Sequence, residues 1–294
     1  MRYFVLLTNH CLDHHEIAMP VKRWRMDVNS GKLFFDREFA LVDSSGTALR
    51  LCQYPKMGSI RPHIDMDRMV LDVSAPDRPK LSIDLRADGR ASSIKEIKVC
   101  GNKCGGKLWG SHAVSSWFTE YLGVQCWLAR SQEGKYSIPK DVGGVQNPAR
   151  QSNRIGFENE APLLLVSTNS IDRLNQVLEN QSSRQVNARY FRPNLVVAMD
   201  YGGSNNNPED QWRSIHVPHS DIELSVTGQC ARCSMVDIDP DSGMKGFTLR
   251  ALAEYRRNKG QITFGIFLRM APPKNELSGN EALWIETGEV INIK

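Results

Sequence analysis

The sequence has no run of 18 or more apolar residues, so no segment is long enough to span a bilayer as a helix. Its start carries a short apolar patch at residues 4–7, but neither the cationic region nor the cleavage site of a secretory signal. Internal repeats and low-complexity tracts are also missing. We therefore expect a cytoplasmic protein with no membrane span.

Cysteines are few and do not form a recognisable framework. The chain has 7 of them in 294 residues, and this odd, dispersed set fits a reducing compartment better than a disulfide scaffold. Cys230 and Cys233 form a C-x-x-C pair, but zinc needs four ligands and no second pair has metal spacing. Cys100 and Cys104 are four apart, and the only close histidine pair is at residues 14–15. These spacings argue against a zinc site.

Positive charge is present only in modest excess. The formal net charge is +4 and the isoelectric point is near 8.6, and the basic clusters at residues 22–25 and 256–259 are short and separated. A nucleic-acid-binding domain normally gathers charge on one face and carries a recognisable module. We expect no nucleic-acid partner, and an anionic small ligand such as a phosphate suits this balance better.

The most informative stretch that is present is residues 228–243. Arg232 lies between Cys230 and Cys233, and a neighbouring guanidinium favours a thiolate. The following residues 235–238 look strand-like, and residues 240–243 have turn chemistry. A thioredoxin-like dithiol would open a helix instead. The pair is therefore a soft ligand or nucleophile, or else two buried structural cysteines.

The first 130 residues predict mainly strands. Apolar and β-branched runs separated by prolines and turn residues are typical of them. One amphipathic helix stands out, with Ser111 at its start and Gly123 at its end. The apolar spacing of that helix predicts core packing rather than a site. The strands are expected at residues 33–35, 39–42, 49–52, 69–73, 81–85 and 94–100.

Residues 131–156 are polar, glycine-bearing and aperiodic, which indicates a linker or mobile loop. The second half mixes strands with short helices, the first of them capped by Ser170. We predict an α+β, β-rich fold with domains at residues 1–130 and 157–294. Other expected elements are strands at 163–166, 195–198 and 262–268, a helix at 248–258, and a closing strand region at 283–293.

Three pieces of the chain together resemble the MOSC family. Residues 33–42, with 53–57 and 60–62, are similar to the N-terminal β-barrel that precedes MOSC domains. Residues 191–197 resemble the arginine-and-asparagine strand of the family, and residues 230–243 its cysteine motif. The finer resemblance is to the C-terminal region of eukaryotic molybdenum cofactor sulfurases. Its motifs appear at residues 116–118, 122–124, 157–160 and 260–265, in family order.

This resemblance implies an N-terminal β-barrel packed on a MOSC barrel, and binding of the molybdenum cofactor (Mo-molybdopterin). Cys233 matches the position that contacts the metal, where a soft thiolate suits molybdenum. Arg37 and Arg192 match positions expected to hold the anionic cofactor. Further contacts to the cofactor are expected from Ser167, Thr168 and Asn194.

Plainer roles remain open for several of these residues. Arg37 is also suited to pairing with Asp36 or a carboxylate on a neighbouring strand, and Arg192 to closing a strand end. Asn194 is a common turn residue, as are Asp239 and Asp241. The first strand departs from the family. Its usual lysine and serine are absent from residues 7–11, so only Cys11 remains there.

The resemblance implies three functions. The first is sulfuration of the cofactor, with Cys233 as the catalytic thiol. Its partners would be an aminotransferase-like sulfur donor that uses pyridoxal phosphate, and molybdenum hydroxylase apo-enzymes as recipients. The chain leaves no length for the donor domain. The second is an oxidoreductase resembling the amidoxime-reducing component, and the third a non-catalytic cofactor carrier.

Overall fold

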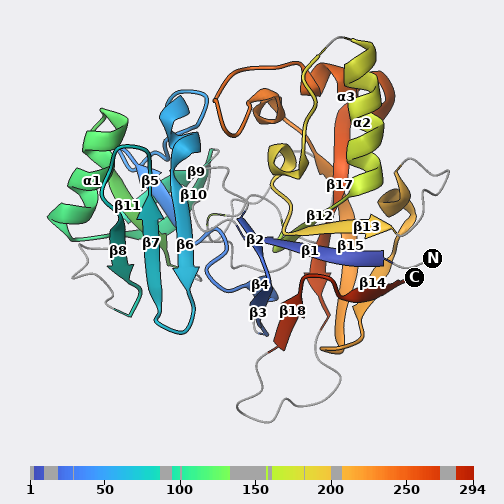
Figure 1. Cartoon of the computed structure of the whole chain (residues 1–294), viewed down its shortest axis with the longest axis horizontal. Coiled ribbons are helices and arrows are strands. Elements are labelled where there is room, and N and C mark those ends of the chain that lie inside the picture. Colours follow the sequence, from blue (N-terminus) through green and yellow to red (C-terminus); the bar gives the residue numbers. More distant parts are fainter. Residues whose placement is uncertain are drawn as a thin grey trace.

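The structure is a computed structural model, and it shows two β-rich halves side by side (Figure 1). The α+β, β-rich class expected from the sequence is confirmed. No helix in the described part of the chain is long and apolar enough to cross a membrane. The described residues are 3–9, 19–28, 30–86, 95–99, 101–132, 157, 161–181, 183–199, 207–271 and 283–294.

The C-terminal half is a closed barrel. Neighbouring strands follow the order β12, β13, β1, β19, β14, β15 and β17, and β17 pairs with β12 to close the ring. All five residues of β12 are buried, which is expected for a strand covered on both faces. These strands are Leu163–Ser167 (β12), Leu195–Met199 (β13), Tyr3–Asn9 (β1), Val290–Ile293 (β19), Ser214–Val217 (β14), Ile222–Ala231 (β15) and Gln261–Met270 (β17).

Two helices pack along one side of this barrel, as Figure 1 shows. Helix α2 (Thr168–Asn180) buries Ile171, Leu174 and Leu178, which are spaced three and four residues apart. Helix α3 (Thr248–Arg256) packs beside it through Ala251 and Leu252. Short elements of this half are η3 (Ala188–Phe191), η4 (Pro208–Gln211), η5 (Ser234–Asp237) and β16 (Arg257–Asn258).

Within the described residues, the N-terminal half contains two small sheets and one α-helix. Helix α1 (His112–Leu122) buries Val114, Trp117, Phe118 and Leu122, so the core stripe predicted from its spacing is confirmed. Gly123 ends it at φ 73°, a conformation that glycine adopts without strain. The sheets are β5 (Phe39–Val42), β11 (Trp127–Ser131), β10 (Asn102–Leu108) and β9 (Lys95–Val99), and β6 (Arg61–Asp65), β7 (Val70–Ser74) and β8 (Leu81–Asp84), with η1 (Pro55–Ser59) before β6.

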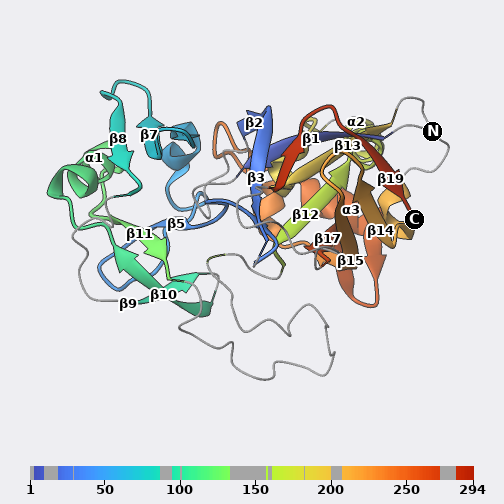
Figure 2. The ribbon, with the colours of Figure 1, turned by 90° about the horizontal axis from the view of Figure 1, so that it is seen from below.

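Strands from the two ends of the chain pair with each other. β1 pairs with β13 and β19 of the barrel, and β18 (Leu283–Glu286) pairs with β3 (Arg23–Asp27). Strands β2 (Met19–Val21) and β3 lie between the two halves in Figure 2, and β4 (Lys32–Leu33) pairs with β3. The domain bounds of 1–130 and 157–294 stay a prediction, and residues 10–11 and 133–156 lie outside the described residues.

The halves also share one core. Its largest cluster combines buried side chains of the first half, such as Phe39 and Leu51, with Leu165, Leu195 and Ile266 of the barrel. A continuous apolar core resists relative motion of its parts far better than a polar contact does. The two halves are therefore packed together as one body.

Four local predictions were wrong. Of the strand predicted at residues 33–35, only Leu33 lies in a strand, β4, and residues 34–37 form a turn. Residues 49–52 form a turn rather than a strand, because the Arg50 carbonyl accepts hydrogen bonds from the N–H groups of Gln53 and Tyr54. Alternating burial at Leu49 and Leu51 produces the strand-like pattern. Residues 235–238 belong mainly to the 3-10 turn η5. The cap of α2 is Ser167, three residues before the predicted Ser170, and its Oγ accepts from the Ser170 N–H.

Candidate functional site

Asn194 joins the two halves at the centre of the predicted site. It is fully buried, and its Oδ1 accepts a hydrogen bond of 3.0 Å from the Leu164 N–H. Its Nδ2 donates to Oδ2 of Asp36 at 2.9 Å, across 158 residues of sequence. A buried amide with both ends bonded is a strong positional constraint. That Asn194 also contacts a cofactor stays a prediction.

Arg37 and Arg192 are brought together by the same junction. Nη2 of Arg37 donates to the Arg192 carbonyl at 3.0 Å, and Nη1 lies 3.7 Å from Asp36. Both residues have left-handed backbones, with φ of 53° and 55°. Non-glycine residues seldom adopt that conformation, and each costs roughly 1–2 kcal/mol. Two such residues in contact therefore mark a place where packing holds an unfavourable backbone.

A third arginine, Arg232, binds backbone carbonyls at the end of η3 and in β17. Nη1 of Arg232 donates to the Phe191 carbonyl at 2.9 Å, and Nε donates to the Phe264 carbonyl at 2.8 Å. Gly265 makes room here, because a Cβ on it would lie 2.6 Å from the Leu165 carbonyl oxygen and 3.4 Å from Nη2 of Arg232. Arg37 and Arg232 thus bind successive carbonyls at the end of η3. The sequence did not predict these contacts of Arg232, and its place between Cys230 and Cys233 was the one signal that pointed to it.

The two cysteines of the motif differ in exposure. Cys230 is buried near the end of β15, whereas Cys233 is exposed at the start of η5. Among the other described free cysteines, Cys104 and Cys126 are buried and Cys52 is exposed. Burial raises the pKa of the Cys126 thiol to about 11, which makes it a poor nucleophile. Accessible thiols in the described part of the chain are those of Cys52 and Cys233.

Ser167 and Thr168 lie at the strand-to-helix junction, as the sequence predicts. Ser167 is fully buried, and its hydroxyl donates to Oε2 of Glu209 at 2.6 Å. The Ser170 hydroxyl donates to the other oxygen of Glu209, also at 2.6 Å. Thr168 is half-buried at the first position of α2. Buried Glu209 was missed because no local pattern marks it. A cofactor contact from Ser167 or Thr168 stays a prediction.

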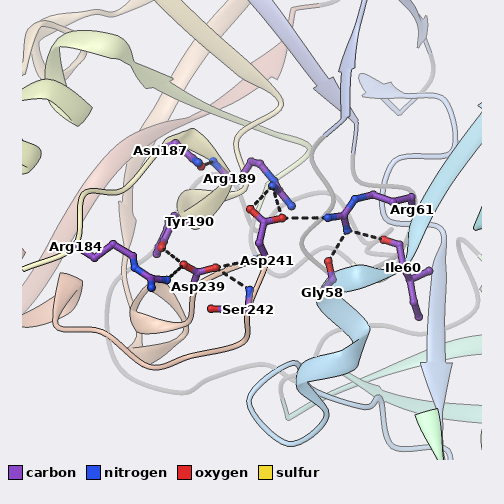
Figure 3. A network of polar contacts seen from close by, with 10 residues as sticks. All are labelled: Gly58, Ile60, Arg61, Arg184, Asn187, Arg189, Tyr190, Asp239, Asp241 and Ser242. Carbon is purple, nitrogen blue, oxygen red and sulfur yellow. Dashed lines mark hydrogen bonds and ion pairs between the residues drawn. The ribbon is translucent and has the colours of Figure 1, made fainter. Parts of the chain in front are cut away.

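The loop after Cys233 is fixed by Asp239. Oδ1 of Asp239 accepts from the N–H groups of Asp241 and Ser242, at 2.8 and 2.9 Å, so its predicted turn role is confirmed. Its Oδ2 accepts from the Tyr190 hydroxyl at 2.9 Å and from Arg184 (Figure 3). Burial raises the pKa of Asp239, but these hydrogen bonds outweigh it and hold that pKa well below its ordinary value.

Asp241 connects the loop to the N-terminal half. Both its oxygens accept from Nη1 of Arg189 at 2.8 Å, and Oδ1 also accepts from Arg61 of β6 at 3.0 Å (Figure 3). The backbones approach closely beside these ion pairs. A Cβ on Gly58 would lie 2.5 Å from the Pro240 carbonyl oxygen, and one on Gly243 would lie 2.4 Å from Cβ of Pro55. The loop is therefore seated on η1.

No group of three or more histidine, cysteine, aspartate or glutamate side chains within the described ranges is arranged to hold a metal ion. A metal reaching Cys233 would have to bring most of its ligands with it. A dithiolene-bound molybdenum does so, because the pterin supplies the sulfur ligands. The exposed Cys233 thiol, with Arg232 next to it in the chain, therefore fits a metal carried by an anionic organic ligand.

Comparisons with known proteins match two family domains along the chain. Residues 19–125 match the MOSC N-terminal beta barrel domain, and residues 152–292 match the MOSC domain. The molybdenum cofactor sulfurase of Oryza sativa is 32% identical over 288 residues, which cover 93% of this chain and 33% of that protein. The molybdenum cofactor sulfurase of Aspergillus clavatus is also 32% identical, over 83% of this chain and 35% of that protein.

The chain spans about a third of the length of the curated relatives it matches. Among solved structures, the YUAD protein from Bacillus subtilis aligns over 99% of this chain and 97% of its own, with 11% identity and a TM-score of 0.37. That structural likeness is too low to add to the argument. The two domain matches, in their order along the chain, show that it belongs to the MOSC family, with a MOSC N-terminal β-barrel followed by a MOSC domain.

Proposed function

We propose that this chain binds the molybdenum cofactor and takes part in its sulfuration. The observation that carries the proposal is the meeting of Arg37 and Arg192 across the junction of the halves. Relatives at about 30% identity are named molybdenum cofactor sulfurases, which supports the same role. The cofactor is here the substrate, which is modified and then passed on.

Each site residue has a role in cofactor binding that follows from its side-chain chemistry. Arg192 and Arg37 hold the anionic pterin, since a planar guanidinium with several donors suits phosphate and pterin carbonyl groups. Asn194 fixes the backbone that carries Arg192, and Ser167 and Thr168 supply the neighbouring helix start. Cys233 presents the soft sulfur ligand that molybdenum favours.

The sulfur comes from another protein or region in this proposal. An aminotransferase-like partner that uses pyridoxal phosphate would take sulfur from free cysteine and carry it as a persulfide. An accessible thiol such as Cys233 receives sulfur by thiol exchange chemistry. Molybdenum hydroxylase apo-enzymes are the proposed recipients, and the cytoplasm is the proposed compartment.

Reconstitution tests the proposal. The purified chain is incubated with molybdenum cofactor and a sulfur donor, and then mixed with an apo-form of a molybdenum hydroxylase. Activation that requires the chain, the cofactor and the donor together supports the proposal. Reduction of N-hydroxylated substrates by the cofactor-loaded chain, without activation of the hydroxylase, would instead identify an oxidoreductase. Cofactor release without any sulfur dependence would identify a carrier.

A further inference from the structure

Two large apolar side chains are exposed on the loop that follows Cys233. Met244 is 59% exposed and Phe247 is 62% exposed, and of the large hydrophobic residues in the described ranges only Val290, at 42%, is comparably open. Single exposed apolar residues are ordinary, but these two lie three positions apart in the short segment that leads into α3. We call Met244 and Phe247 the apolar pair.

The backbone under the apolar pair is ordered by its own hydrogen bonds. The Asp239 N–H donates to the Met244 carbonyl at 2.8 Å, and the Gly246 N–H donates to the Asp237 carbonyl at 2.6 Å. Oδ1 of Asp237 accepts from the Leu249 N–H at 2.7 Å. An apolar side chain presented on a fixed backbone loses little entropy on binding, which favours it as an interaction hot spot.

The pair also lies close to the candidate thiol. Cys233 precedes η5, and a 3-10 turn rises about 2 Å per residue, which places Asp237 roughly 8 Å further along. Gly246 is bonded to Asp237, so Phe247 follows within a residue of that point. A protein that covers the apolar pair would therefore bring its own groups near Cys233.

The charged residues around the apolar pair determine which kind of partner surface is complementary to it. Lys245 and Arg250 are exposed on either side of Phe247. The negative charge of the nearby Asp241 carboxylate is paired with the positive charges of Arg189 and Arg61. The rim is therefore cationic, and a partner with an apolar centre and acidic rim is complementary to it.

We propose that the apolar pair is the docking surface for the protein that carries the sulfur as a cysteine persulfide. The inference rests on the proposed function. Its occupant is indicated by length, since the relatives are about three times as long as the part this chain matches, so in them a further segment of about twice that length is joined to it. In the docked state the Cys233 thiolate attacks the outer sulfur of the persulfide. The S–S bond breaks, the donor cysteine leaves as a thiolate, and Cys233 becomes a persulfide with no net oxidation or reduction.

The test compares two sulfur donors on four proteins. The protein donor is a pyridoxal-phosphate cysteine desulfurase of the same organism, charged with ³⁵S-cysteine, and the small donor is ³⁵S-labelled glutathione persulfide. The proteins are the full chain, Met244→Ser, Phe247→Ser and, as the matched control, Val290→Ser. Phe247 occupies the N-cap of α3, where serine is favourable, so that substitution does not threaten the fold.

With the protein donor, we expect the donor concentration for half-maximal labelling of Cys233 to rise about tenfold in Met244→Ser and Phe247→Ser. The maximal rate and the Val290→Ser control should be unchanged. The small donor should label all four proteins equally. Equal labelling of all four by the protein donor, or labelling by the small donor alone, overturns the docking inference. Failure of the small donor to label Cys233 in the unmodified chain overturns the proposed function instead.

Discussion

The carbonyl oxygen of Arg192 accepts a hydrogen bond of 3.0 Å from Nη2 of Arg37, and the two residues are 155 positions apart. Both have left-handed backbones. The contact places the predicted cofactor arginines at the junction of the two halves. Neither half alone would present both groups, so the candidate site depends on the packing between them.

Replacing Arg192 by lysine should weaken retention of the molybdenum cofactor although the charge is preserved. Lysine lacks the planar fork, and a lost charge-assisted hydrogen bond costs roughly 1.5–3 kcal/mol. Since about 1.4 kcal/mol is a factor of ten, at least a tenfold weaker affinity is expected. Bound pterin after gel filtration measures it, with Arg213→Lys, an exposed arginine, as the control. Wild-type stoichiometry in Arg192→Lys would argue against direct contact.

Asn194→Ala should destabilise the protein by about 2–4 kcal/mol, because it leaves a buried N–H of Leu164 and the Asp36 carboxylate without this partner. Asn175→Ala is the matched control. Asn175 also bonds at both ends, but within the C-terminal half and in a half-buried position, so about 1–2 kcal/mol is expected. Urea denaturation gives both values. Equal losses of unfolding free energy in the two variants would show that the junction contacts of Asn194 add no extra stability.

Gly58→Ala should cost about 1–3 kcal/mol, since a Cβ there would lie 2.5 Å from the Pro240 carbonyl oxygen and the loop would have to shift. Gly246→Ala is a suitable comparison, because its Cβ would meet only the Asp237 carbonyl oxygen, at 3.4 Å. Thermal unfolding of both variants measures the difference. A Gly58→Ala protein as stable as Gly246→Ala would mean that the loop is not seated on η1.

Asp239→Asn should lower stability at pH 7 by about 1.5–3 kcal/mol, through weaker hydrogen bonds with Tyr190 and Arg184. The folded-state pKa of Asp239 is depressed below its unfolded value of about 3.9. Its contribution is thus fully present above about pH 4 and is lost as the pH falls through the folded pKa. Denaturation curves at a series of pH values should converge for variant and wild type under acid conditions. A constant difference across that range would contradict the assignment.

The sequence predicts those parts of the fold that local patterns control. The apolar spacing in α1 and the buried runs of β12 and β17 identify these elements, and Gly123 ends its helix as expected. Local patterns do not identify the helix cap where two similar residues could both occupy it. Ser167 and Ser170 both suit a cap, and only the burial of Ser167 against Glu209 decides between them.

The contacts that build the site are long-range and have no local signal. Asp36 meets Asn194 across 158 residues, and Arg61 meets Asp241 across 180. The resemblance to the MOSC family named Arg37, Arg192 and Cys233 because family motifs keep such residues in order, whereas Arg184, Arg189 and Glu209 carry no motif of their own. Their roles follow from the tertiary packing alone.

Activation of an apo-molybdenum hydroxylase by the Cys233→Ser and Cys230→Ser variants tests whether Cys233 is the thiol that serves cofactor sulfuration. Circular dichroism confirms that each variant is folded, and Cys52→Ser controls for the other exposed thiol among the described residues. We predict that Cys233→Ser abolishes activation, because a hydroxyl is a harder and poorer ligand than a thiolate. Cys230→Ser and Cys52→Ser should retain most of it. Full activation by Cys233→Ser would show that Cys233 is not this thiol.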